Sequence, residues 1–149
     1  MSDDEVSVLA EDVGEWDTEL AITPFPGAPT NVTAGTVTNR LVGGRWLVTD
    51  QSTESGYEGH GVYGWDAATG GYVGFWVDGM GAGVARGTGT WDPTTRTMSY
   101  DMAVDHEGTT YTYRETTQRL DDGSRLYSNV VPVPDGHHEV IRATFRPRA

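Results

Sequence analysis

Short runs of alternating apolar and polar residues, separated by turn sequences, extend along most of the chain. In one run Met98, Tyr100 and Met102 fall on one face of an extended strand, and Ser99 and Asp101 fall on the other. This period of two residues is typical of a half-buried β-strand. The pattern predicts ten strands: 15–22, 31–42, 45–53, 57–65, 72–78, 83–91, 97–104, 109–120, 125–131 and 138–146.

The connections between these segments are short and contain typical turn residues, such as the hairpin sequence Asp121 to Gly123. The chain has 20 threonines and 16 valines but only six leucines, a composition that favours strands over helices. Regularly spaced strands with short antiparallel connections indicate an all-β protein, a single up-and-down barrel of about ten strands.

Glycines recur at alternate positions in the middle of the chain, for example at Gly59 and Gly61 and at Gly87 and Gly89. Repeated glycines on one face of a strand mark a bend, a bulge or a close approach of other atoms. A phosphate-binding loop at 79–83 is disfavoured, because neither a lysine nor a helix signal follows it. The segment 72–78 is apolar or aromatic on both faces, so we expect both faces to be covered.

The net charge of −12 is unevenly distributed, because eight of the 22 acidic residues lie within residues 1–19. We interpret residues 1–13 as an acidic, solvated N-terminal arm that precedes a barrel domain at 14–149. The alternative is a short helix over residues 3–12 that caps part of the domain.

The charge and the apolar pattern also exclude several classes of partner. A strongly acidic chain disfavours nucleic acid and anionic membrane surfaces. No apolar run approaches the roughly 20 residues that cross a bilayer, and the acidic start does not resemble a signal peptide, so we expect a cytoplasmic protein. The absence of cysteine excludes disulfides, thiolate metal sites and cysteine nucleophiles.

Several segments resemble known proteins. Gly14-Glu-Trp16 is similar to the Gly-x-Trp opening of lipocalin-like barrels. The middle of the chain resembles the bacterial domain of unknown function 1579 family across roughly residues 14–146, through the segments 41–48, 59–66, 72–81, 87–92 and 113–115. The resemblance implies a lipocalin-like (calycin) barrel in which Trp16 plugs the closed end beneath an arginine from a late strand. It implies no catalytic residues.

Aromatic side chains and one histidine are the candidates for a binding site. The five tryptophans indicate either core packing or an aromatic-lined cavity, and Trp46 and Trp76 are the mid-strand cavity candidates. His60 lies between two glycines and is either structural, a polar group in the cavity, a general base, or an axial ligand for haem. We otherwise predict no cofactor and no metal site.

Charged residues within strands are further candidates, because buried charges must be paired. Tyr113 and Glu115 share one face of a strand. In lipocalin-like barrels an interior arginine and tyrosine commonly hold a ligand carboxylate, a role that the resemblance suggests for Arg142 with Tyr113. The alternative for Arg142 is an exterior ion pair between neighbouring strands.

Three hypotheses for function follow. The first, which we favour, is a barrel that binds a small apolar or amphiphilic molecule in a cavity lined by Trp46, His60, Trp76, Tyr113, Glu115 and Arg142. The second is an enzyme in which His60 works with Asp78 or Glu115 at the barrel mouth. The third is a non-catalytic homodimer that buries the second face of 72–78.

Overall fold

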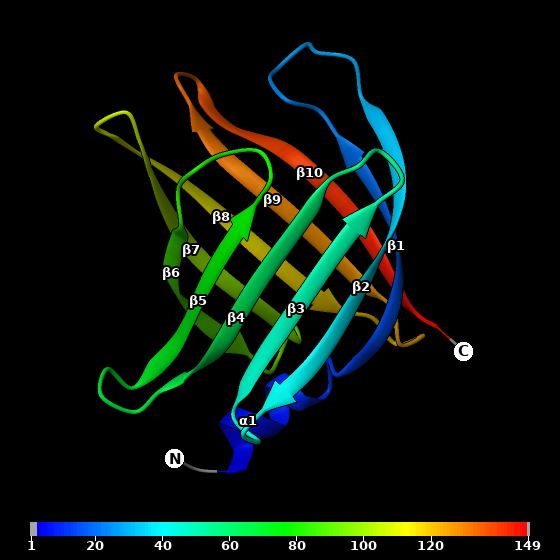
Figure 1. The fold of residues 1–149 in the computed structure, drawn as a ribbon, viewed down its shortest axis with the longest axis vertical. Helices are drawn as coiled ribbons and strands as arrows, with labels where there is room; N and C mark the ends of the chain where they lie inside the picture. The colour runs from blue at the N-terminus through cyan, green and yellow to red at the C-terminus, as the bar shows by residue number, and fades with distance from the viewer. Residues whose placement is uncertain (1–2, 149) are drawn as a thin grey trace.

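Ten antiparallel strands close into one barrel, with a short helix at one end (Figure 1). The computed structural model describes residues 3–148. Each strand pairs with its neighbours in the chain, and β1 closes the barrel against β10, so the predicted up-and-down barrel is confirmed. The elements are α1 (Asp3–Ala10), β1 (Gly14–Ile22), β2 (Asn31–Val42), β3 (Trp46–Thr53), β4 (Glu58–Asp66), β5 (Gly71–Asp78), β6 (Ala85–Asp92), β7 (Thr97–His106), β8 (Thr109–Arg119), β9 (Arg125–Val133) and β10 (Gly136–Pro147).

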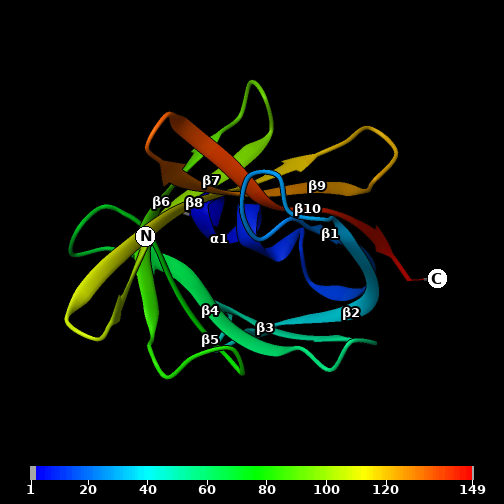
Figure 2. The same cartoon turned by 90° about the horizontal axis from the view of Figure 1, so that it is seen from above.

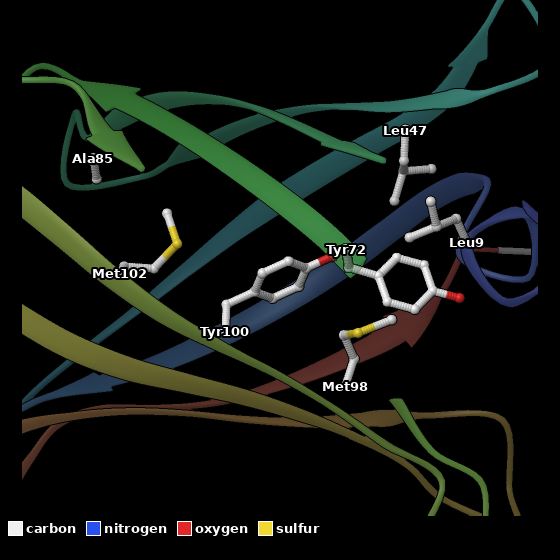
Figure 3. Packing of buried hydrophobic residues seen from close by; sticks show 7 residues of the cluster. All are labelled: Leu9, Leu47, Tyr72, Ala85, Met98, Tyr100 and Met102. Atoms are coloured by element: carbon white, nitrogen blue, oxygen red, sulfur yellow. The ribbon is translucent and has the colours of Figure 1, made fainter. Parts of the chain in front are cut away.

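Alternation along the strands separates an inner face from an outer face. In β7 the side chains of Met98, Tyr100 and Met102 are buried inside the barrel, while Asp101 is exposed on the outside. Figure 3 shows these three residues packed with Leu47 of β3 and Tyr72 of β5. Side chains from facing walls therefore form the core.

Glycines on the inner face leave space for aromatic rings. A Cβ atom on Gly61 would lie 2.7 Å from Tyr63 Cε2 and 2.8 Å from Trp76 Cε3. A Cβ atom on Gly74 would lie 2.9 Å from the Tyr63 ring. These distances are too short for carbon atoms, which confirms close approach as the reason for the repeated glycines.

The outer face of β5 is exposed rather than covered. Tyr72 and Trp76 point inward, whereas Val73, Phe75 and Val77 point outward, and Phe75 keeps 43% of its surface accessible. The expectation that another part of this chain covers this face is therefore wrong for residues 3–148. Burial of the face by a second copy of the chain stays a prediction.

The acidic N-terminus forms a helix that closes one end of the barrel, so the solvated arm that we favoured is wrong for residues 3–10. Acidic residues in the first turn suit the positive end of the helix dipole. Leu9 is only 3% exposed and packs with Leu47 and Tyr72 (Figure 3). Seen from above, α1 lies within the outline of the barrel (Figure 2). Among residues 3–148, no helix is long and apolar enough to cross a membrane.

Two buried arginines bind the end of this helix. Arg119 donates to the carbonyl oxygen of Val8 and, at 2.7 Å, to the Glu11 carboxylate. Arg125 donates through Nε to the Asp12 carboxylate at 3.0 Å, and Arg119 reaches the other Asp12 oxygen at 3.4 Å. These contacts satisfy carbonyl groups that a helix leaves unpaired at its C-terminus, where positive charge is also favourable.

Trp16 completes the closed end as the lipocalin-like resemblance implied. Its indole nitrogen donates to the Asp12 carbonyl oxygen at 3.0 Å. The guanidinium carbon of Arg125, from the late strand β9, lies 4.9 Å from the centre of the Trp16 ring. The tryptophan therefore joins the chain segment after α1 to β9, which is separated from β1 only by β10.

We expect Asp12→Ala to lower the free energy of unfolding by about 3 kcal/mol, because it leaves two buried guanidinium groups without their shared carboxylate. Asp17→Ala, which breaks the exposed ion pair with Arg148, is the matched control and should cost less than about 1 kcal/mol. Urea unfolding of both variants measures the difference. Equal losses would show that the buried pairs have no special role.

We expect Gly61→Ala to destabilise the protein by roughly 1–3 kcal/mol, because the added methyl group displaces Tyr63 and Trp76. Gly71→Ala adds the same group where nothing lies within 4 Å, and should have little effect. Thermal unfolding and the near-ultraviolet circular dichroism of the aromatic side chains report both changes. An unchanged spectrum for Gly61→Ala would contradict this account of the packing.

Candidate functional site

The structure divides the six predicted site residues equally between the two faces of the barrel wall. Trp76, Tyr113 and Glu115 lie on the inner face, and the first two pack against the core. The other three, Trp46, His60 and Arg142, lie on the outer face. The prediction of one site that contains all six is therefore wrong.

His60 lies on the outer wall, with 45% of its side chain exposed. Its Nδ1 atom is 2.6 Å from the Asp50 carboxylate, on the neighbouring strand β3. Asp78 pairs with Gly59 and points inward, as does Glu115, so neither carboxyl is on the same face as His60. The predicted pairing of His60 with Asp78 or Glu115 is wrong, and the ring does not point toward an interior haem.

Arg142 and Trp46 also face outward. The Arg142 side chain is 59% exposed and lies 3.4 Å from the Glu139 carboxylate. Arg142 therefore forms an exterior ion pair, but within β10 rather than between neighbouring strands as predicted. Trp46 precedes the buried Leu47 and lies over Gly64, where a Cβ atom would overlap the indole ring. Neither residue contributes to the interior.

Glu115 lies inside the barrel in a cluster of four tyrosines, which we call the Glu115 cluster. Tyr127 donates its hydroxyl to Glu115 Oε2 at 2.8 Å, and Asn129 donates its amide to the Tyr127 oxygen at 3.3 Å. Tyr100 stands directly opposite Glu115 in the pairing of β7 with β8. Burial raises the pKa of every tyrosine in the cluster, and the negative charge of Glu115 raises it further, for Tyr63, Tyr100, Tyr113 and Tyr127.

Burial sets the charge state of this carboxyl. It raises the pKa of Glu115 to about 7, and the hydrogen bond from Tyr127 opposes the rise without cancelling it. Near neutral pH the protonated and ionised forms are therefore both populated. Each form offers a different hydrogen-bonding pattern, because the protonated carboxyl also donates.

Tyr100 has a hydroxyl that is buried and has no hydrogen-bond partner within residues 3–148. Its ring centre lies 5.2 Å from that of Tyr63, at a tilt of 58°. A buried hydroxyl without a partner is costly, and such groups commonly bind water or a ligand. The interior therefore holds an unused polar atom, which belongs to the residue that pairs with Glu115 and is directed toward Tyr72 (Figure 3).

A second carboxyl lies at the open end of the barrel. Trp76 donates its indole N–H to Asp78 Oδ2 at 3.0 Å, and the Tyr57 hydroxyl donates to the same oxygen at 2.8 Å. Burial raises the pKa of Tyr113, and the charges of Glu115 and Asp78 raise it further, so Tyr113 lies within electrostatic reach of both acids. Phenol and carboxyl groups thus extend from the mouth to the Glu115 cluster.

Sequence reasoning missed Tyr57, Tyr63 and Tyr127 as site residues. The alternation in β7 placed Tyr100 on an apolar face but did not show what it meets across the barrel. The signal for Tyr127 is its pairing with Thr117, two residues after Glu115 on the neighbouring strand. Such a pairing depends on the strand register, which one sequence does not reveal.

Two hollows are open depressions of the surface rather than the enclosed cavity that we expected. One, of about 560 Å³, lies on the outer wall beside Asp50 and His60. The other, of about 450 Å³, lies at the closed end beside Trp16 and Arg125. The inward-facing candidates Trp76, Tyr113 and Glu115 line neither hollow.

The fold and the interior define a class of protein: a small closed barrel, capped by a helix at one end, with carboxyl and phenol groups inside. The chain belongs to the family described as "Protein of unknown function (DUF1579)", whose model matches residues 2–146. The resemblance noted in the sequence is thereby confirmed.

A solved crystal structure shares this architecture. The chain is similar to the crystal structure of Rv2717c from M. tuberculosis, with a TM-score of 0.75 and 15% identity over 97% of this chain and 98% of that one. At this identity the likeness shows the fold alone. A redesigned β-barrel matches with a TM-score of 0.39 and 13% identity over 97% of this chain and 96% of the other, a score too low to show a shared fold. No curated protein matches the chain.

We expect the pH dependence of stability to reveal Glu115. Because folding raises its pKa from 4.5 to about 7, the stability it contributes is fully present below pH 4.5 and is lost as the pH rises through 7. Relative to Glu115→Gln, the wild-type free energy of unfolding should fall by roughly 3 kcal/mol between these limits. Parallel pH profiles of the two proteins would contradict the assignment.

Proposed function

We propose that the protein binds a small, partly apolar molecule inside the open half of the barrel, against Trp76, Tyr113 and Glu115. The observation that carries this proposal is the buried Tyr100 hydroxyl, which has no partner within residues 3–148 and belongs to the residue that pairs with Glu115. A packed core requires no such group, whereas a binding site uses a few polar atoms among aromatic ones.

The open end of the barrel supports this proposal. The loops after β1 and β5 lie at this end, opposite α1 (Figure 1). They carry the exposed apolar residues Phe25 and Met80, with 63% and 82% of their surfaces accessible. Exposed apolar groups beside an opening suit the entry of a molecule with an apolar part.

The chemistry of the interior favours binding over the enzyme hypothesis. Acid–base chemistry at the mouth required His60 near Asp78 or Glu115, and His60 instead pairs with Asp50 on the outer wall. The inward carboxyls have tyrosine and tryptophan donors, which orient a ligand by hydrogen bonds. A binding role requires no change in the arrangement of these carboxyl, phenol and indole groups.

The two mid-strand tryptophans provide a matched test with the fluorescent probe 1-aminoanthracene, an apolar aromatic amine that is uncharged at neutral pH. We expect the wild-type protein to enhance its emission. Trp76→Ala should weaken binding about tenfold, equivalent to about 1.4 kcal/mol. Trp46→Ala, on the outer face, should leave the affinity unchanged.

Tyr113→Phe provides a second, milder variant that keeps the ring and removes only the inward hydroxyl. Its thermal unfolding temperature should stay within a few degrees of the wild type. A loss of affinity for 1-aminoanthracene in this variant would therefore reflect the binding site and not unfolding. Absence of probe binding to the wild type, or equal losses in the two tryptophan variants, would refute an interior site.

A further inference from the structure

We propose that the ligand of this barrel is an organic cation, an amine that carries an apolar body, held between Glu115 and the tyrosines around it. This inference rests on the proposed function, because it names the chemical class of the molecule that the same interior accepts. It begins from the distribution of charge inside the barrel.

The open half of the interior holds carboxyl groups but no arginine. Of the ten basic residues, all arginines, only Arg119 and Arg125 are buried, and both bind Glu11 and Asp12 at the closed end. The remaining eight lie on the outer wall, in turns or near the C-terminus. Glu115 and Asp78 therefore have no arginine as a counter-ion inside the barrel.

A buried carboxylate without a counter-ion is costly, and protonation is one way to remove the cost. An ammonium group is the other way, because it pairs with the ionised carboxyl and donates hydrogen bonds to it. Tyr127 supplies one donor to Glu115, which leaves acceptor positions on the carboxylate free for a ligand.

The aromatic rings of the interior also favour a positively charged ligand. The electron-rich faces of tyrosine and tryptophan attract cations. Tyr63 and Tyr100 form a tilted pair of rings 5.2 Å apart, and Trp76 lies between this region and the mouth. The rings also provide apolar contact for the body of the ligand, so one set of side chains suits both of its parts.

Anionic and neutral ligands fit these groups less well. An anion would be repelled by Glu115 and Asp78, and Arg142, the residue predicted to hold a ligand carboxylate, is on the outer wall. A neutral alcohol would leave Glu115 without a counter-ion. The cation alone uses the acids and the rings together.

The proposal has a signature in pH. The titratable groups that face Glu115 are Tyr63, Tyr100, Tyr113 and Tyr127, whose raised pKa values keep them protonated through neutral pH. The carboxyl is therefore the group in this cluster that exchanges a proton when a cation binds. Binding below pH 7 should release a proton, and affinity should rise with pH until the carboxyl is fully ionised.

The test compares three probes of one shape: hexylamine, hexan-1-ol and hexanoate. Isothermal titration calorimetry of the full chain at pH 8 should give at least tenfold tighter binding for hexylamine than for hexan-1-ol, with hexanoate weakest. Repetition at pH 6 in two buffers of different ionisation enthalpy should show release of a large fraction of a proton with hexylamine and none with hexan-1-ol.

Two variants separate the site from general attraction to an acidic surface. Glu115→Gln should weaken hexylamine at least tenfold, abolish the proton release and remove the preference for hexylamine over hexan-1-ol. Asp50→Asn removes one negative charge from the outer wall and should change neither probe.

The outcomes distinguish the two proposals. Equal affinity for hexylamine and hexan-1-ol, tightest binding of hexanoate, or unchanged hexylamine binding in Glu115→Gln would overturn the cation inference while leaving an interior site in place. Failure of all three probes, together with failure of 1-aminoanthracene, would overturn both.

Discussion

The architecture depends on the carboxylate of Asp12, which two buried arginines share at the closed end of the barrel. Arg119 and Arg125 come from β8 and β9, whereas Asp12 follows α1, so the contact joins the first residues of the chain to its last third. The same arginines bind carbonyl groups at the end of α1, and Arg125 covers Trp16. The acidic and arginine side chains at this end neutralise each other. The helix can therefore cover the core without a further layer of apolar side chains.

The two ends of the interior are electrostatically different as a result. At the closed end the acids and arginines neutralise each other, and the arginines have no groups left for a ligand. At the open end Glu115 and Asp78 have phenol and indole donors but no arginine partner, and burial keeps the pKa of Glu115 near neutrality. Inside the barrel, the negative charge that has no arginine partner is therefore confined to the half that faces the mouth. This asymmetry, rather than the overall acidity of the chain, bears on ligand choice.

Local sequence pattern was sufficient to predict most of the fold but only half of the site. Alternation and turn residues identify ten strands, and the Gly-x-Trp opening places Trp16 at the closed end. The prediction that Trp46, His60 and Arg142 point into the barrel was wrong, because a shift of one residue in a strand exchanges its inner and outer faces. Trp46 and His60 occupy strands in which glycines and valines obscure the alternation, and the bulge between Glu139 and Ile141 interrupts it just before Arg142. The helix α1 was underrated because its eight residues are largely acidic, and its stability comes from contacts with distant strands.

The position of the chain ends has a practical consequence. α1 begins the described chain at the closed end, and the backbone of Arg148 binds that of Glu15 at 2.8 Å, so both ends of residues 3–148 lie on the side away from the mouth (Figure 1). A tether, affinity tag or fusion partner joined at either end therefore extends away from the opening. Immobilised on a sensor surface by its terminus, the barrel presents its open rim to the solution.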